Sequence, residues 1–158
     1  MATPELMAYH DTEYGFPVGD DAALFERLVL EMFQAGLSWR TILAKRPAFF
    51  SAFRGFIPAR VAAFGSRDLA RLLDDRGIVR NRRKIEAAIH NARVVCTLIE
   101  THGSLVRFVR TLPLDDRTAT VKTMRATFQF MGPLVVEEFL MSTGFWPVRH
   151  EPSCFLAG

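Results

Sequence analysis

A single carboxylate interrupts the apolar segment 30–39, LEMFQAGLSW. On a helix, the advance of 100° per residue places Glu31 on the same ridge as Leu24 and Leu28, which predicts that the carboxylate is buried. An unpaired buried carboxylate is costly to the folded state. Glu31 therefore requires either a basic partner inside the fold or a ligand that is cationic or donates hydrogen bonds, and the residues alone leave both alternatives open.

Three aromatic residues flank this segment: Tyr9 and Tyr14 precede it, and Trp39 ends it. Packing in the core is the default interpretation of such a group. The alternative is a pocket for a flat, electron-poor ring, because aromatic faces attract cations and stack on nucleobases.

Basic side chains gather in residues 77–84, GIVRNRRK, which contain Arg80, Arg82, Arg83 and Lys84. Cations at a helix N-terminus are slightly unfavourable with the helix dipole. The cluster is therefore either a solvated helix end or a phosphate-binding site that also uses free backbone N–H groups. The formal net charge of +3 and the pI of about 9.2 favour acidic partners.

His10, His150 and Cys154 are candidate metal ligands. The H-x3-C spacing of the last two can bring both to one side of a turn, which suits tetrahedral zinc. Three donors are one short of a closed structural site, and scattered residues of these types more often have no metal-binding role.

The composition is that of a soluble globular protein, with 49% apolar and 23% charged residues in a chain of 158. This length suits one domain with its own core, and two cysteines cannot form a disulfide framework. Neither a signal peptide nor an apolar run of membrane-spanning length is evident. We therefore expect one domain over residues 1–158, a monomer in the cytoplasm with no membrane association.

Capping residues indicate where the first helices lie. Residues 1–21 are rich in Gly, Pro and Asp, which favours an ordered loop docked on the domain. Asp20 or Asp21 then caps a core helix that ends near Gly36, and Ser38 caps the next helix.

Further along the chain, Pro47 and Pro58 are each expected to open a short helix. Ser66 is expected to cap another, with Gly77 in the left-handed conformation after it. The longest helix is predicted over residues 80–101, and Gly103 ends it. One apolar stripe supports this assignment: Ile85, Ile89, Ala92, Cys96 and Ile99.

The C-terminal third contains a predicted short helix over 104–112 and a final pair over 118–128 and 133–143. Gly132 lies in the turn of this pair, as in a helix-hairpin-helix, although an αα-corner without a ligand has the same pattern. No period of two persists over a strand length, so the predicted fold class is all-α.

Four segments together resemble the DNA-3-methyladenine glycosylase I family: YHDTEYG at 9–15, LEMFQAGLSW at 30–39, GIVRNRRKI at 77–85 and FQFMG at 128–132. They occur in the family order over nearly the whole chain. The resemblance implies a compact helical domain of the helix-hairpin-helix DNA glycosylase type, with its N- and C-terminal segments packed together. It also implies the excision of 3-methyladenine from alkylated double-stranded DNA in base excision repair.

The resemblance assigns roles to residues of the predicted site. Glu31 matches the carboxylate that contacts the excised base, and we take it as the catalytic residue. Tyr9 and Trp39 match aromatic residues of the base pocket, and Tyr14 stands where the family usually has tryptophan. Three of the four family zinc ligands are matched, by His10, His150 and Cys154. The fourth, a cysteine N-terminal to Thr3, has no counterpart in this sequence.

The chemistry implied is hydrolysis of an already weakened glycosidic bond. N3-methylation makes the adenine cationic, so the base leaves neutral and little acid or base catalysis is needed. Bifunctional relatives carry a Schiff-base lysine just past the hairpin glycine, whereas Pro133 and Leu134 follow Gly132 here, which predicts a monofunctional enzyme. The aspartate that most superfamily members place after the second hairpin helix is not found in FWPVRHEP.

Salt-sensitive and mostly sequence-independent DNA binding is expected from the hairpin turn and the basic helix start. Phe128 or Phe130 could wedge into the gap left by the flipped base. The alternatives are an inactive helix-hairpin-helix DNA-binding homologue, and a helical bundle with an internally paired Glu31 and a protein partner. The expected DNA contacts are Arg80, Arg82, Arg83, Lys84, Phe130, Met131 and Gly132.

Overall fold

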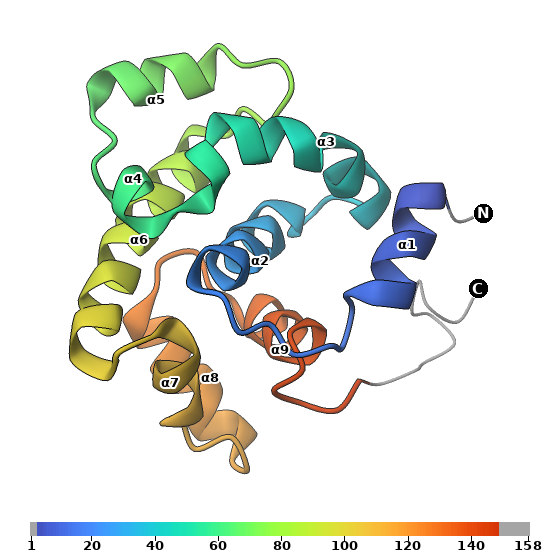
Figure 1. The fold of residues 1–158 in the computed structure, drawn as a ribbon, viewed down its shortest axis with the longest axis vertical. Helices are drawn as coiled ribbons and strands as arrows, with labels where there is room; N and C mark the ends of the chain where they lie inside the picture. The colour runs from blue at the N-terminus through green and yellow to red at the C-terminus, as the bar shows by residue number, and fades with distance from the viewer. Residues whose placement is uncertain (1–2, 149–158) are drawn as a thin grey trace.

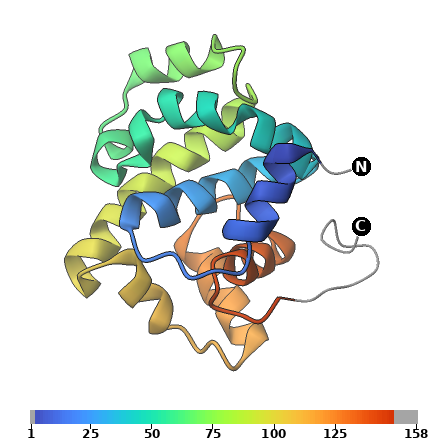
Figure 2. The same ribbon diagram turned by 45° about the vertical axis from the view of Figure 1, so that its right-hand side comes forward.

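The computed structural model describes residues 3–148, and Figures 1 and 2 show helices joined by short connections over this range. No strand occurs in this part of the chain, which confirms the predicted all-α class. The elements are α1 (Pro4–Thr12), α2 (Asp21–Gln34), α3 (Trp39–Ala52), the 3₁₀ turn η1 (Arg54–Phe56), α4 (Pro58–Ala62), α5 (Ser66–Leu73), α6 (Arg82–His102), α7 (Leu105–Arg110), α8 (Arg117–Thr127) and α9 (Pro133–Ser142).

Helix α2 is the central element, and both views show it surrounded by the other helices (Figures 1 and 2). Residues 24–33 are all buried, and α2 contacts α3, α4, α6, α7 and α9. Its start is fixed by Asp20, whose carboxylate accepts the N–H of Ala23 at 2.9 Å. The Asp21 carboxylate accepts the N–H of Leu105 at 2.9 Å and so ties α2 to the start of α7. Glu31 is therefore carried by the most enclosed helix of the fold.

The N-terminal segment differs from the predicted loop, because residues 4–12 form α1. Three local features start this helix. The Thr3 hydroxyl accepts the N–H of Leu6 at 3.2 Å, Pro4 occupies the first turn and Glu5 complements the helix dipole. Leu6 and Tyr9 are buried, and α1 packs against α3. The expected docking on the domain is thus achieved by a helix.

Pro47 does not open a new helix, because it lies inside α3. Proline removes one backbone hydrogen bond, but the apolar side chains on either side of it belong to one buried face, which holds the helix together. Ile42 and Leu43 are buried before it, and Phe49 is buried after it. The start of α3 agrees with the sequence, since the Ser38 hydroxyl accepts the N–H of Thr41 at 3.2 Å.

Two boundaries around α5 were predicted wrongly. Its N-cap is Gly65, whose N–H donates to the Asp68 carboxylate at 3.1 Å, so Ser66 is the first helical residue. The helix ends at Leu73, well before Gly77, and Gly77 does not have a positive φ. An earlier helix end removes the need for a left-handed residue there.

The boundaries of the last helices agree with the sequence within one or two residues. Asn81 caps α6, and Gly103 ends it in the left-handed region with φ +92°. Asp116 caps α8, and Gly132 precedes Pro133 at the start of α9. Helices α8 and α9 are in contact and form the expected hairpin.

Candidate active site

Glu31 is buried in the core, with 1% of its surface exposed. Neither carboxylate oxygen has a hydrogen-bond partner among residues 3–148. Burial raises the pKa of Glu31 well above its ordinary value, and the negative charge of Glu138 raises it further, whereas the positive charge of Arg27 lowers it. A carboxylate in this state destabilises the fold unless a ligand supplies the missing donors.

The three predicted aromatic residues come together from separate elements. The rings of Tyr9 and Trp39 are stacked, with centroids 5.3 Å apart, and the rings of Tyr9 and Tyr14 are in an edge-to-face arrangement with centroids 6.0 Å apart. Burial raises the pKa of the Tyr9 hydroxyl, with Arg27 opposing the shift and Glu31 adding to it. Tyr9 therefore lies within electrostatic range of the buried Glu31 carboxylate, and the three aromatic residues form one cluster.

Arg27 is a member of this site that we did not single out from the sequence. It is buried, lies one turn before Glu31 on α2, and donates to the Tyr9 hydroxyl oxygen and to the Ser142 carbonyl, each at 2.8 Å. Its guanidinium carbon is 4.8 Å from the centroid of the Tyr9 ring. These contacts direct the Arg27 guanidinium toward Tyr9 and α9, and it does not hydrogen-bond the Glu31 carboxylate. An arginine four residues before Glu31 in an apolar helix was the available signal.

A second charged cluster, which we call the Arg46 clamp, consists of Arg46, Glu13 and Glu26. Arg46 on α3 donates four hydrogen bonds of 2.7 to 3.1 Å to the two carboxylates. Burial alone would raise the pKa of Glu13, but the hydrogen bonds and charge of Arg46 outweigh it and hold the pKa below its ordinary value. The clamp fixes the segment that carries Tyr14 against α2 and α3.

The hairpin turn between α8 and α9 is held by a buried amide. Asn91 on α6 accepts the N–H of Gln129 at 2.8 Å and donates to its carbonyl at 2.9 Å. This contact precedes Phe130, which has φ +59° and 39% of its surface exposed. Phe128 and Met131 are buried, so the wedge prediction for Phe128 is wrong, and of the two candidate wedge residues Phe130 is the one with an exposed ring.

The basic helix start divides into exposed and buried members. Arg80, Arg82 and Arg83 are exposed at the beginning of α6. Lys84 is buried, and its Nζ atom donates to the carbonyls of Phe33 at 3.1 Å and of Ala35 at 2.8 Å. Lys84 therefore satisfies the C-terminal carbonyls of α2, a role that makes it unsuitable as the phosphate ligand we predicted.

A sequence profile described as methyladenine glycosylase matches residues 1–127. The chain belongs to the methyladenine glycosylase family. A DNA-3-methyladenine glycosylase of Haemophilus influenzae is 42% identical over 155 residues, which cover 86% of this chain and 84% of that protein. DNA-3-methyladenine glycosylase 1 of Escherichia coli is 45% identical over 106 residues, which are 67% of this chain and 57% of that protein.

Solved structures of the family have the same fold. The 3-methyladenine DNA glycosylase I of Staphylococcus aureus has a TM-score of 0.84 and 32% identity, with 100% of this chain and 94% of that chain covered. A variant 3-methyladenine DNA glycosylase I crystallised in complex with 3-methyladenine has the same TM-score and identity over 100% of this chain and 95% of that chain.

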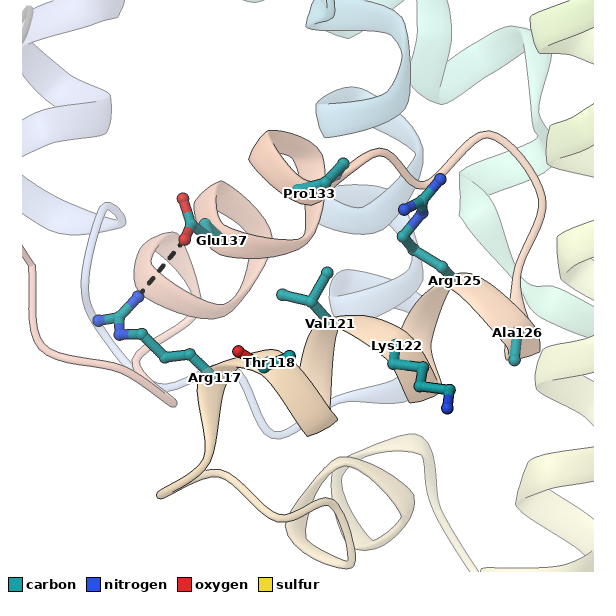
Figure 3. Close-up of a pocket in the computed structure, with 8 residues that line it drawn as sticks. All are labelled: Arg117, Thr118, Val121, Lys122, Arg125, Ala126, Pro133 and Glu137. Atoms are coloured by element: carbon teal, nitrogen blue, oxygen red, sulfur yellow. Dashed lines mark ion pairs between the residues drawn. The ribbon is translucent and has the colours of Figure 1, made fainter.

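A groove of about 590 Å³ lies between α8 and α9 (Figure 3). Arg117 and Glu137 point toward each other across it, with their nearest nitrogen and oxygen 3.8 Å apart. The Arg117 guanidinium also lies 4.4 Å from the ring centroid of Trp146. Arg125, at the other end, also lines a second hollow around the hairpin turn. The residues that line the groove are Arg117, Thr118, Val121, Lys122, Arg125, Ala126, Pro133 and Glu137.

Of the three predicted zinc ligands, only His10 lies within the part of the chain that the structure describes, and His150 and Cys154 lie outside it. The described residues contain no group of three potential metal ligands. The His10 Nδ1 atom is 3.0 Å from the Asp11 carboxylate, and Nε2 has no hydrogen-bond partner among these residues. Metal-bound histidines often have this arrangement, in which a carboxylate orients the ring.

None of the helices from residue 3 to residue 148 is both long and apolar enough to span a membrane. The cytoplasmic location and the monomeric state stay predictions from the sequence.

Proposed function

We propose that this protein is a monofunctional DNA glycosylase that excises 3-methyladenine from alkylated double-stranded DNA. The observation that carries the proposal is the buried Glu31 carboxylate, which lacks hydrogen-bond partners among the described residues and lies within electrostatic range of Tyr9, whose ring stacks on Trp39. The named activity of its relatives and the 3-methyladenine complex of a related enzyme support the same function.

The site has the chemistry needed to recognise an alkylated adenine. The exocyclic amino group of the base can donate to Glu31, and a hydrogen bond to a charged acceptor in a buried site is about twice as strong as one between neutral groups. The aromatic pair favours a cationic ring by about 0.5–2 kcal/mol over a neutral one. Because Tyr9 and Trp39 already stack on each other, the base would pack against this pair and not between its rings.

DNA binding would come from the exposed surface beside the pocket. The backbone N–H groups near Gly132 and the cations Arg80, Arg82 and Arg83 would contact phosphates. Phe130 is exposed on the same hairpin and is the proposed wedge for the gap that base flipping leaves. Lys84 would contribute to DNA binding only indirectly, through the proposed wedge, because its Nζ atom lies 5.9 Å from the centroid of the Phe130 ring.

Hydrolysis needs little from the protein once the cationic base is bound, because the base departs as a neutral molecule. Water would attack C1′ of the sugar as the glycosidic bond breaks, the bond electrons would pass to the ring of the base, and the attacking water would lose a proton to the solvent. Gly132 is followed by Pro133 and Leu134, so no lysine is available there to form a Schiff base with the sugar. We therefore expect base release without strand cleavage.

The decisive assay is incubation of methylated DNA with the protein, followed by chromatography of the released bases. We expect release of 3-methyladenine and an intact, abasic strand. If no 3-methyladenine is released while the protein still binds the DNA, it is the inactive DNA-binding homologue. If it does not bind DNA either, the protein-binding alternative gains support.

We also propose a structural zinc ion held by His10, His150 and Cys154, three ligands that the family resemblance supplies. The Nε2 atom of His10, which has no hydrogen-bond partner among residues 3–148, and the Asp11 carboxylate on the other ring nitrogen support this proposal. Zinc would cross-link the segments that contain its ligands and would take no part in hydrolysis. Elemental analysis of the purified protein should give one zinc per chain, and Cys154→Ser should lower this ratio. A metal-free unaltered protein would contradict the proposal.

A further inference from the structure

Glu138 is a half-buried carboxylate on α9 whose partner comes from the other end of the chain. The Tyr14 hydroxyl donates to its Oε2 atom at 3.0 Å. Glu138 forms no ion pair with any described residue. The nearby cation Arg117 faces the neighbouring carboxylate, Glu137 (Figure 3). Its hydrogen-bond partner is thus neutral, and burial and the charge of Glu137 raise the pKa of Glu138, whereas the Tyr14 hydrogen bond lowers it.

A chain of contacts links Glu138 to the base pocket. Tyr14, its hydrogen-bond partner, meets the Tyr9 ring edge-on, and Tyr9 stacks on Trp39. Helix α9, which carries Glu138, packs directly against α2, which carries Glu31. The two carboxylates lie within electrostatic range, since the charge of Glu138 raises the pKa of Glu31.

Two poorly solvated carboxylates on neighbouring helices repel each other, and a neutral ligand leaves that repulsion in place. A cationic ligand relieves it, whereas a neutral purine of the same shape does not. Selectivity of this kind depends on a penalty against the wrong ligand as much as on attraction to the right one. We propose that Glu138 is a specificity-determining residue of the base pocket, where its charge selects cationic alkylated bases over neutral purines. This inference rests on the proposed function of the Glu31 site.

A purely structural alternative is that Glu138 only positions Tyr14. The two roles separate in a pair of variants. Glu138→Gln removes the charge but keeps an oxygen that can accept the Tyr14 hydrogen bond. Tyr14→Phe removes that bond but keeps the charge and the ring. Glu137→Gln is the matched control, because it neutralises the adjacent carboxylate on the same helix.

The probes are 3,9-dimethyladeninium, a fixed cation whose N9-methyl group stands for the sugar bond, and neutral 3-methyladenine. Affinities are measured by titration calorimetry at a pH where the affinity of the unaltered protein for the cation has reached its plateau. In Glu138→Gln we expect the preference for the cation to fall about tenfold, with the affinity for 3-methyladenine within about twofold. Tyr14→Phe and Glu137→Gln should keep the preference within about twofold.

The pH dependence gives a second readout that a positioning role would not change. Affinity for the cation should fall on acidification as Glu31 is protonated. In Glu138→Gln this fall should move to lower pH, because removal of a neighbouring negative charge lowers the pKa of Glu31. Other groups around the two carboxylates stay in place in this variant: Tyr9 and Tyr14 from the N-terminal segment, Arg27 on α2, and the Arg117–Glu137 pair.

If Glu138→Gln loses affinity equally for both probes, or keeps the same preference for the cation over 3-methyladenine, the inference is wrong and Glu138 has a structural role. The proposed function fails in a different way. If the unaltered protein binds neither probe, or if Glu31→Gln binds both as tightly as the unaltered protein, the assignment of the Glu31 site as a base pocket is wrong. The inference about Glu138 is then wrong as well.

Discussion

Helix α2 carries two buried carboxylates in opposite states, Glu26 and Glu31. Glu26 belongs to the Arg46 clamp and receives two hydrogen bonds from the guanidinium. Glu31, five residues later and more deeply buried, receives none from the described residues. A structural role is enough to explain Glu26, because its pairing with Arg46 joins α2 to α3. An uncompensated charge costs stability, and a cost of this kind is a common property of ligand sites.

The largest expected effect comes from removing the uncompensated charge. Glu31→Gln should lower 3-methyladenine excision about 100-fold, which corresponds to the loss of a hydrogen bond to a charged group. It should also raise the melting temperature by about 3 °C, because a buried unpaired carboxylate is replaced by a neutral amide. Single-turnover kinetics and calorimetry measure the two changes. A variant that loses both activity and stability would show that Glu31 is compensated in the free protein.

Breaking the compensated cluster should have the opposite pattern. Arg46→Gln leaves Glu26 without its hydrogen-bond partner and leaves Glu13 with only its 3.9 Å ion pair to Arg27. It should lower the free energy of unfolding by about 2 kcal/mol, a value reduced for partial exposure. Excision per folded molecule should stay within about threefold of the unaltered protein. Urea denaturation and activity assays at low temperature test this. A loss of excision as large as that in Glu31→Gln would break the distinction between the two clusters.

The same distinction applies to the basic helix start, where Arg82 and Arg83 are exposed and Lys84 is hydrogen-bonded to α2. Charge reversal of Arg82 and Arg83 should weaken DNA binding about tenfold and reduce the slope of log affinity against log salt by about two. Lys84→Gln should leave the slope unchanged and lower stability by about 1 kcal/mol. Fluorescence anisotropy over a salt series distinguishes the two variants. A changed slope in Lys84→Gln would show that Lys84 contacts DNA phosphates directly.

The smallest effect concerns the dependence of stability on pH. The folded-state pKa of Glu13 is lowered. Ionised Glu13 therefore adds to the free energy of unfolding above its unfolded-state pKa, and this stabilisation is lost as pH falls through the folded-state pKa. The folded-state pKa of Glu31 is raised, so its unfavourable contribution is relieved as pH falls through that value. The melting temperature advantage of Glu31→Gln should therefore shrink as pH is lowered from 8 toward 5. A constant difference would indicate that Glu31 does not titrate in this range.

Much of the fold follows from local signals in the sequence. Asp20, Ser38 and Gly103 mark helix ends through side-chain caps and a left-handed residue, which depend on neighbours within a few positions. Pro47 shows the limit of such signals, because burial of the surrounding face holds α3 together across the proline. Helix α1 shows a second limit: the Gly, Pro and Asp residues around it predict a loop, but the Thr3 cap and the burial of Leu6 and Tyr9 stabilise a helix.

The sequence by itself determined the kind of site: a carboxylate on an apolar helix ridge, three aromatic residues around it and a basic helix start in family order. Helical periodicity shows which face of a helix is buried, but not which other side chains meet that face. The tertiary structure alone decided that Arg46 pairs with Glu26, that Glu31 has no partner among the described residues, and that Glu138 lies near it. Tyr14 and Glu138 are 124 residues apart in the chain, and their hydrogen bond forms only because the fold brings the segment before α2 against α9.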